Sequence, residues 1–251
     1  MFMSQAHADA LDQLVRKVNV VTRLTESEER ALRALPLIAK TFAAGQDFVR
    51  EHDQPDHCAL IVRGWVSRYK TTSVGRRQIL SLHFPGEIPD LQSLLLSTMD
   101  HSLAALTELA VAFIPHAAVK AAIQAEPHLA VPLWRLTLID AALYREWLMV
   151  MGRLNAVQHM GHLFCELQMR LEAVGLASRE TGFDFPITQT ELGDAVGMSP
   201  VHVNRTIQDM RRLDLITWNQ GRLLIHNFED LADRSDFDPT YLHQSPSIGA
   251  F

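Results

Sequence analysis

The chain has 251 residues, of which 47% are hydrophobic and 21% charged, and its formal net charge is −6 at pH 7. This composition is that of an ordinary globular protein with one large or two modest domains, and the negative charge argues against a nucleic-acid partner. The two cysteines are too few for a disulfide framework or for a four-cysteine metal or iron–sulfur site. Because the sequence has neither a long apolar run nor a basic leader, we expect a cytoplasmic protein with no membrane contact.

The first part of the chain changes from helical to β texture. Residues 8–40 have a helical pattern that ends in the run LPLIAK. From residue 41 to 114 the sequence has short β-compatible runs, which are Ala59–Val62, Trp65–Lys70, Gln78–Phe84 and Ala110–Ile114. Glycines at 45, 64, 75 and 86 separate these runs, as turns separate the strands of a β-roll or jelly roll. We predict an N-terminal β-roll sensor domain over residues 1–126.

A long apolar helix is predicted next. Helical texture returns at about residue 116 and strengthens from Pro127 in the run LAVPLWRLTLIDAALYREWLMVMGRLN. The 3-4 spacing of a two-stranded coiled-coil seam relates six side chains, Val131, Trp134, Leu138, Ala141, Arg145 and Leu148. Burial against its own domain is the alternative, but a helix of this kind between two domains favours a two-fold dimer. We predict a dimerisation helix and hinge over 127–154, with Gly152 and Asn155 at the hinge.

The segment from 187 to 226 carries the most informative pattern. A further amphipathic helix, Ala156–Val174, leads into it. Thr188 and Glu191 have the spacing of a capping box, and Gly197 stands where a helix must stop and the chain reverse. The apolar stripe of this first helix consists of Leu192, Ala195 and Val196.

A second capped helix and a hairpin complete the pattern. Ser199 caps the helix and Pro200 occupies its first turn. Val203, Ile207 and Met210 recur at core spacing, and two β runs follow around Asn219-Gln220-Gly221. Helix, turn, helix and hairpin predict a winged helix-turn-helix domain over residues 155–235. Its expected DNA contacts are Thr188, Gln189, Ser199, Pro200, Val201, His202, Asn204, Arg205, Gln208 and Arg222.

The charge of this segment bears on that prediction. Four arginines, at 205, 211, 212 and 222, are balanced by Glu191, Asp194, Asp209 and Asp214. We therefore expect modest phosphate neutralisation per monomer, to which a dimer would add. Capped helices with a hairpin also occur in domains that bind no DNA, which is the alternative. Residues 236–251 have no periodicity and predict a loose C-terminal tail.

The order of these elements resembles the Crp/Fnr family of bacterial transcription regulators, over roughly residues 20–230. The resemblance rests on ITQTELGDAVGMSPVHVNRTIQDMRRLDLI, Ile61–Gly64, FPGE at 84–87 and GRLNAVQHMGHLFCELQMRL at 152–171. It implies an α+β fold with a jelly-roll-like β-roll, a dimerisation helix and a winged helix-turn-helix. It also implies a homodimer on an inverted-repeat operator, with RNA polymerase as a further partner for an activator.

The resemblance also implies how bases are read. The family's recognition helix presents a glutamate and, four residues later, an arginine, which together read a G·C pair. Arg205 occupies the arginine position, whereas Val201 stands at the glutamate position and Pro200 where the cyclic-AMP receptor has an arginine. This departure puts the usual half-site in doubt, and His202 and Asn204 are the substitute readers.

For the sensor, the resemblance implies an effector pocket formed by Gly86, Glu87, His101 and Ser102. Cyclic-nucleotide members bind phosphate with an arginine–serine pair, which is His101-Ser102 here, so we do not expect cyclic AMP. The iron–sulfur branch requires four cysteines. A haem branch uses a β-roll histidine, for which His83 is the candidate, although we favour a half-buried strand residue with a satisfied hydrogen bond.

Three functions compete. The leading one is a homodimeric DNA-binding regulator with a ligand or redox sensor in the β-roll. The second is a cupin-like metal enzyme or metal sensor using His52, His57, His83 or His101. The sequence lacks the His-x-His pair that such a metal site would use, and an enzyme would leave the winged segment unexplained. The third is a regulator whose β-roll is only a scaffold. Cys58 and Cys165 lie in apolar sequence, which favours buried inert thiols.

Overall fold

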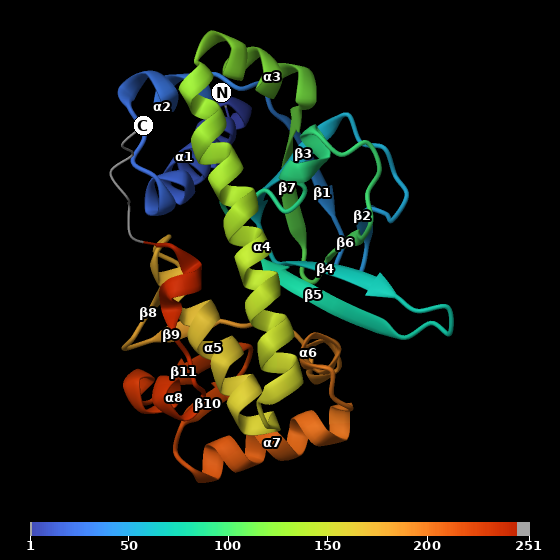
Figure 1. Cartoon of the computed structure of the whole chain (residues 1–251), viewed down its shortest axis with the longest axis vertical. Helices are drawn as coiled ribbons and strands as arrows, with labels where there is room; N and C mark the ends of the chain where they lie inside the picture. Colours follow the sequence, from blue (N-terminus) through green and yellow to red (C-terminus); the bar gives the residue numbers. More distant parts are fainter. Residues whose placement is uncertain (1, 245–251) are drawn as a thin grey trace.

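The computed structural model describes residues 2–244 and has three parts in chain order (Figure 1). N-terminal helices and a β-roll come first, the long helix α4 (Ala130–Arg153) follows, and a helical domain with a small sheet completes the chain. The predicted α+β architecture is confirmed. No helix among the described residues is long and apolar enough to cross a bilayer.

The predicted helical segment 8–40 is interrupted twice. Helix α1 (Phe2–Val21) ends before Thr25, which caps α2 (Glu26–Arg33) through a capping box with Glu28. The chain then becomes extended, and β1 (Ile38–Phe42) pairs antiparallel with a distant strand, in which Phe113, 75 residues later, lies opposite Ile38. The prediction was wrong for residues 38–40 because a distant strand supplies the hydrogen bonds that decide their conformation.

The β-roll consists of two antiparallel sheets, ordered β1-β7-β3 and β2-β6-β4-β5. The remaining strands are β2 (Asp47–Val49), β3 (His57–Arg63), β4 (Val66–Thr71), β5 (Arg77–His83), β6 (Ser102–Ala105) and β7 (Leu109–Pro115). The four predicted β runs lie in or largely within β3, β4, β5 and β7. Apolar side chains from both sheets, such as Phe42, Ile61 and Leu103, form the core between them.

Helix α4 connects the two domains. It follows η1 (Leu91–Leu94), α3 (His116–Ala125) and η2 (Pro127–Leu129) and runs between the β-roll and the C-terminal domain (Figure 1). Gly152 lies inside α4, which continues to Arg153, and the hinge at Gly152 and Asn155 stays a prediction. The backbone becomes extended at Leu154, and Asn155 caps α5 (Ala156–Glu172) by accepting from two backbone N–H groups.

The C-terminal domain packs three helices and a sheet around α5. Its elements are β8 (Ala177–Ser178), β9 (Gly182–Asp184), α6 (Gln189–Val196), α7 (Pro200–Arg212), β10 (Ile216–Asn219), β11 (Arg222–Ile225) and α8 (Phe228–Arg234). Its core continues into the β-roll, because the rings of Trp65 and Phe185 have centroids 6.0 Å apart and Trp65 also packs on Phe84. The two domains therefore share apolar packing as well as a covalent connection.

The described part of the tail is packed, contrary to expectation. A short turn, η3 (Pro239–Leu242), buries Leu242 and places the Tyr241 hydroxyl 3.0 Å from the carboxylate of Glu166. Local periodicity could not reveal this, since the contact is with α5, 75 residues earlier. Residues 245–251 of the predicted loose end lie outside the described residues.

Candidate nucleic-acid interface and domain junction

Helices α6 and α7 form the predicted helix-turn-helix. The Thr188 side chain accepts the N–H of Glu191 at 3.1 Å, and the Glu191 carboxylate accepts the N–H of Thr188 at 2.7 Å. Gly197 ends α6 in the left-handed region with φ of +68°. A Cβ on Gly193 would lie 2.6 Å from the Met198 carbonyl oxygen, so glycine is needed for the close approach of the turn.

The predicted DNA contacts are gathered on one face. Val203, Ile207 and Met210 are buried, as the spacing of α7 predicts, and Thr206 joins them. All ten predicted contact residues are exposed. Nine of them occupy the first turns of α6 and the exposed side of α7, and the Asn204 amide donates to Gln189 at 3.2 Å across these helices. We call these nine residues the recognition face; α7 lies at the end of the molecule remote from the β-roll (Figure 1).

Arg205 is free on this face. Asp209, the acidic residue four positions later on α7, pairs with Arg212. Arg205 makes no hydrogen bond or ion pair with any residue from 2 to 244. Its five N–H donors are therefore available for an external acceptor.

Arg222 is differently placed, on the wing strand β11. Its guanidinium donates to the Thr181 carbonyl at 2.8 Å and to the Asp184 carboxylate at 2.7 Å. Arg211 was not among the predicted contacts, yet it donates to the Trp218 carbonyl and lines an open groove between the wing turn and the start of α6. The charge count of the segment contained Arg211, but its position depended on the fold of the hairpin.

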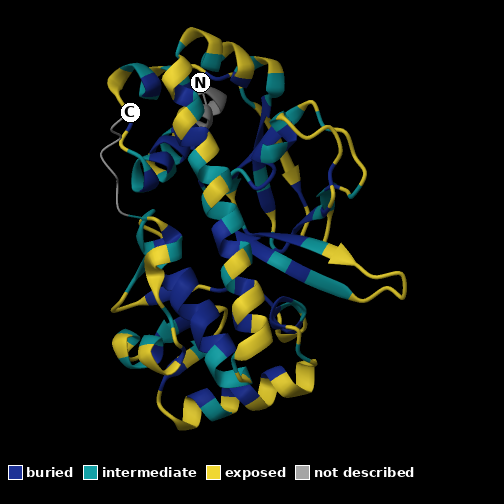
Figure 2. Ribbon diagram, viewed as in Figure 1, coloured by how far each residue is buried: buried dark blue, intermediate teal, exposed yellow. Residues whose placement is uncertain are grey.

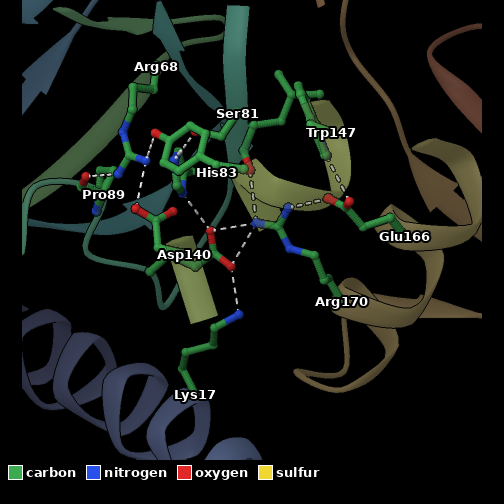
Figure 3. A network of polar contacts seen from close by, with 12 residues as sticks. Lys17, Arg68, Ser81, His83, Pro89, Asp140, Trp147, Glu166 and Arg170 are labelled. Carbon is green, nitrogen blue, oxygen red and sulfur yellow. Dashed lines mark hydrogen bonds and ion pairs between the residues drawn. The ribbon is translucent and has the colours of Figure 1, made fainter. Parts of the chain in front are cut away.

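A buried polar cluster joins the two domains around Glu87 (Figure 3). Lys17 Nζ of α1 lies 2.6 Å from the Glu87 carboxylate, His83 Nδ1 lies 2.9 Å away, and Arg170 Nη2 of α5 lies 3.0 Å away. Burial opposes the ionisation of Glu87, but the charges of Arg170 and Lys17 hold its pKa well below the usual value. The loop of the β-roll that contains Gly86 and Glu87 is thus hydrogen-bonded to Arg170 of the C-terminal domain.

Arg170 extends this cluster into the C-terminal domain. Its guanidinium also donates to Glu166 at 2.8 Å and to the Leu82 carbonyl at 2.9 Å. Glu166 in turn accepts from Trp147 Nε1 of α4 at 2.8 Å and from the Tyr241 hydroxyl. We call Lys17, His83, Glu87, Glu166 and Arg170 the junction network. The pair Glu166 and Arg170, four residues apart in an apolar helix, was the sequence signal that could have found it.

A second buried cation fastens the β-roll to α4. Arg68 of β4 is 1% exposed and donates to Asp140 at 2.7 Å, to the Tyr144 hydroxyl and to the Pro89 carbonyl (Figure 3). Burial opposes protonation of Arg68, but Asp140 and Tyr144 raise its pKa. The space between β4 and α4 is therefore occupied by the protein's own guanidinium.

The four residues of the predicted effector pocket do not line one cavity. Gly86 and Glu87 lie beside a cavity, whereas His101 and Ser102 contact other residues. A cavity of about 70 Å³ next to Gly86 and Glu87 is lined by α1, α4, Arg170 and the tail, and its lining does not include His101 or Ser102. His101 lies 2.7 Å from Asp100, and the Ser102 hydroxyl accepts the N–H of Glu51 at 3.0 Å. Burial and the nearby Arg68 lower the pKa of His101 to about 4, so this side chain is neutral at pH 7.

These contacts do not fit the groups that the family can bind. Glu87 is saturated by three donors, and neutral His101 offers no fixed charge for a cyclic phosphate. Both nitrogens of buried His83 are engaged, by Ser81 and by Glu87, so neither suits an axial haem ligand. Residues 2–244 contain no group of three or more His, Cys, Asp or Glu side chains arranged to hold a metal ion. Cys58 and Cys165 are buried, and burial raises the pKa of each thiol.

Comparisons with known proteins agree with this arrangement. Residues 39–126 match the cyclic nucleotide-binding domain, and residues 158–234 match the Crp-like helix-turn-helix domain. The chain is 26% identical over 221 residues to the transcriptional activator protein FnrL of Cereibacter sphaeroides, covering 85% of this chain and 86% of that protein. It is 25% identical over 191 residues to the nitrogen fixation regulation protein FixK of Rhizobium meliloti, covering 75% and 82%.

Among solved structures, FixK2 from Bradyrhizobium japonicum superimposes with a TM-score of 0.72 at 18% identity, covering 79% of this chain and 97% of that one. The fold is therefore that of these regulators. Both domains, in this order and joined by a long helix, define a class of transcription regulators, and the chain belongs to the Crp/Fnr family.

Proposed function

We propose that the protein is a homodimeric, sequence-specific DNA-binding regulator of transcription that recognises an inverted repeat. The observation that carries this proposal is the recognition face, where Arg205 is exposed and unpaired within the described chain. A bidentate contact from arginine to guanine O6 and N7 is the commonest specific contact in the major groove. Such a protein has no enzymatic role and works in the cytoplasm, where the bacterial chromosome lies.

The proposed dimer rests on α4. Four apolar residues of the predicted seam are exposed in one protomer, Val131 at 45%, Trp134 at 66%, Leu138 at 52% and Leu148 at 74%. Arg145 is exposed as well, and Ala141 is half-buried. Exposed positions recur along α4 (Figure 2), and a row of exposed apolar side chains on one helix is unusual for a surface that faces water. A second copy of α4 would cover it and relate the two α7 helices by a two-fold axis.

In the dimer each α7 would enter one major groove. Two-fold related recognition helices read half-sites about one helical turn apart, roughly 34–36 Å. Thr188, Gln189 and the capped start of α7 would contact phosphates and fix the register, whereas side chains of α7 would contact bases. Arg222 would contribute less to phosphate binding than predicted, because Asp184 already neutralises it.

The β-roll would act through its contacts with the DNA-binding domain. Arg77 of β5 pairs with Asp194 of α6 at 2.8 Å, and the junction network and the shared core add further contacts. A signal would act by favouring one arrangement of these contacts over another. We infer that this signal is not a cyclic nucleotide, because the chain's own Lys17 and Arg170 already bind Glu87. For an activator, RNA polymerase would be a further partner.

Selection of binding sites from random duplex DNA tests the proposal. We expect an inverted repeat with a guanine read by Arg205 in each half-site. Arg205→Ala should weaken binding to that site by about 1–3 kcal/mol per half-site and relax the preference at one symmetric base pair. Arg16→Ala, a change in an arginine of α1, is the matched control and should leave binding unchanged. An Arg205→Ala variant with unchanged affinity and base preference would show that α7 is not the reading helix.

A further inference from the structure

The most unusual side chain of the recognition face is Val201. It is the second residue of α7 and is 80% exposed. Two exposed polar side chains lie near it, since His202 is the next residue and Arg205 follows one helical turn later. A large apolar side chain makes no favourable contact with water in this position, and on a face that meets DNA it is suited to contact an apolar group of a base.

We propose that Val201 selects thymine by packing its isopropyl group against the C5 methyl group of one thymine in each half-site. This inference rests on the proposed function. Only thymine presents a methyl group in the major groove, whereas the other bases present hydrogen-bond donors and acceptors alone. A valine has neither donor nor acceptor. Over another base it would displace water from polar groups without replacing their hydrogen bonds.

The spacing of Val201 and Arg205 suits contacts with neighbouring base pairs. The Asn204 amide already donates to Gln189, so one of its hydrogen-bonding groups is committed within the protein. Val201 and Arg205 are four residues apart, which is about 6 Å along the helix axis. Base pairs are stacked about 3.4 Å apart, so the thymine should lie within roughly two base pairs of the guanine that Arg205 contacts.

Replacement of thymine by uracil tests this contact, because the two bases differ only by the methyl group. Each thymine of the selected site is replaced in turn by deoxyuridine, and binding is measured by titration. At one symmetric position we expect wild-type protein to bind about fourfold more weakly per half-site, and about 15-fold more weakly with both replaced. A single methyl group buried at about 0.8 kcal/mol corresponds to that fourfold change.

The valine is assigned by a double comparison. Val201→Ala should lose most of the preference for thymine over uracil at that position, because the two γ-methyl groups that contact the thymine methyl are removed. Val74→Ala is the matched control, since Val74 is a similarly exposed valine, at the tip of the β4–β5 hairpin, and it should retain the full preference for thymine. The uracil scan on wild-type protein does not depend on either variant folding.

The outcomes separate the inference from the proposed function. If no sequence is selected from random DNA, the proposed function fails and the assignment of Val201 fails with it. If a site is selected but no uracil weakens binding, Val201 reads no thymine. If a uracil effect remains at full size in Val201→Ala, another side chain contacts the methyl group and the assignment is overturned.

Discussion

Two arginines of the C-terminal domain, Arg170 and Arg205, are in opposite situations. Arg170 is buried and donates to Glu87, to Glu166 and to a backbone carbonyl. Arg205 is exposed and has no partner within residues 2–244. Both are helical arginines in the same domain, so residue type and secondary structure do not distinguish a buried, paired arginine from an exposed, unpaired one.

The comparison separates a region whose charged groups are paired within one protomer from surfaces whose groups face solvent. At the junction, the charges of Lys17 and Arg170 are met by Glu87 and Glu166, and removal of any partner leaves a buried charge uncompensated. Four apolar seam residues of α4 and Arg205 on the recognition face are exposed, and Arg205 has no partner within residues 2–244. The junction therefore joins the domains within one protomer, whereas we expect DNA to cover the recognition face and a second copy to cover the seam of α4.

The largest expected effect comes from a charge in the open stripe of α4. Leu138→Asp should place two aspartates in the dimer interface, each with a desolvation cost of several kcal/mol. We expect a folded monomer that has lost operator binding, as measured by sedimentation and DNA titration. Leu176→Asp, at an exposed leucine in the C-terminal domain, is the control and should remain dimeric. Wild-type protein that sediments as a monomer at micromolar concentration would contradict the assignment of the stripe.

At the closed junction, Arg170→Ala should reduce the free energy of unfolding by about 3–5 kcal/mol. The variant leaves Glu87 and Glu166 buried without their shared cation. Urea unfolding measures the loss, and Arg205→Ala is the natural control, because removal of an exposed unpaired arginine should change stability by less than about 0.5 kcal/mol. Equal losses in the two variants would remove the distinction between the regions.

How far the sequence predicts each region follows from the distance between partners. The helix-turn-helix was predicted almost to the residue, because the capping box at Thr188 and the glycine at 197 are signals within a few residues of one another. The junction was not predicted, because Lys17 and Arg170 lie 70 and 83 residues from Glu87. A pattern read over one helix turn contains no information on such pairs.

Short or distant elements were missed for the same reason. Strands β2 and β6 have three and four residues, too few for an alternating pattern. The four-residue spacing of Arg205 and Asp209 on α7 favours an ion pair, yet Asp209 pairs with Arg212. Whether an exposed arginine is free depends on side-chain choices that spacing alone does not decide.

Buried Asp90, next to β3 of the β-roll, makes the stability of the protein depend on pH. Its carboxylate accepts the Ala59 N–H at 2.8 Å, and burial raises its pKa to about 6. Because the folded state binds this proton more tightly than the unfolded state, the contribution is fully present below about pH 4 and is lost as the pH rises to about 6. The loss at pH 7 amounts to roughly 3 kcal/mol.

Asp90→Asn isolates this contribution. Asparagine retains the acceptor for Ala59 and cannot ionise, so the variant should be more stable than wild type at pH 7 and similar to it at pH 4. Denaturant unfolding at several pH values gives the difference in free energy of unfolding between the two proteins. The contributions of the other titrating groups cancel in this difference. A difference that does not change between pH 4 and 7 would show that Asp90 has an ordinary pKa in the folded state.

The smallest expected change in stability concerns the packed part of the tail, η3, and tests whether its contact with Glu166 stabilises the junction network. Tyr241→Phe removes the hydroxyl that donates to Glu166 and lies 3.1 Å from His162, without changing the ring. A hydrogen bond to a buried carboxylate contributes about 1.5–3 kcal/mol, so urea unfolding should show a loss near the lower end, since Arg170 and Trp147 still donate to Glu166. Thr240→Ala, an exposed change in the same turn, removes only the local bond from the Thr240 hydroxyl to Asp238 and should cost less. Base preference should be unchanged in both variants, because the tail lies outside the recognition face. A Tyr241→Phe protein as stable as wild type would mean that the tail rests on α5 without stabilising it.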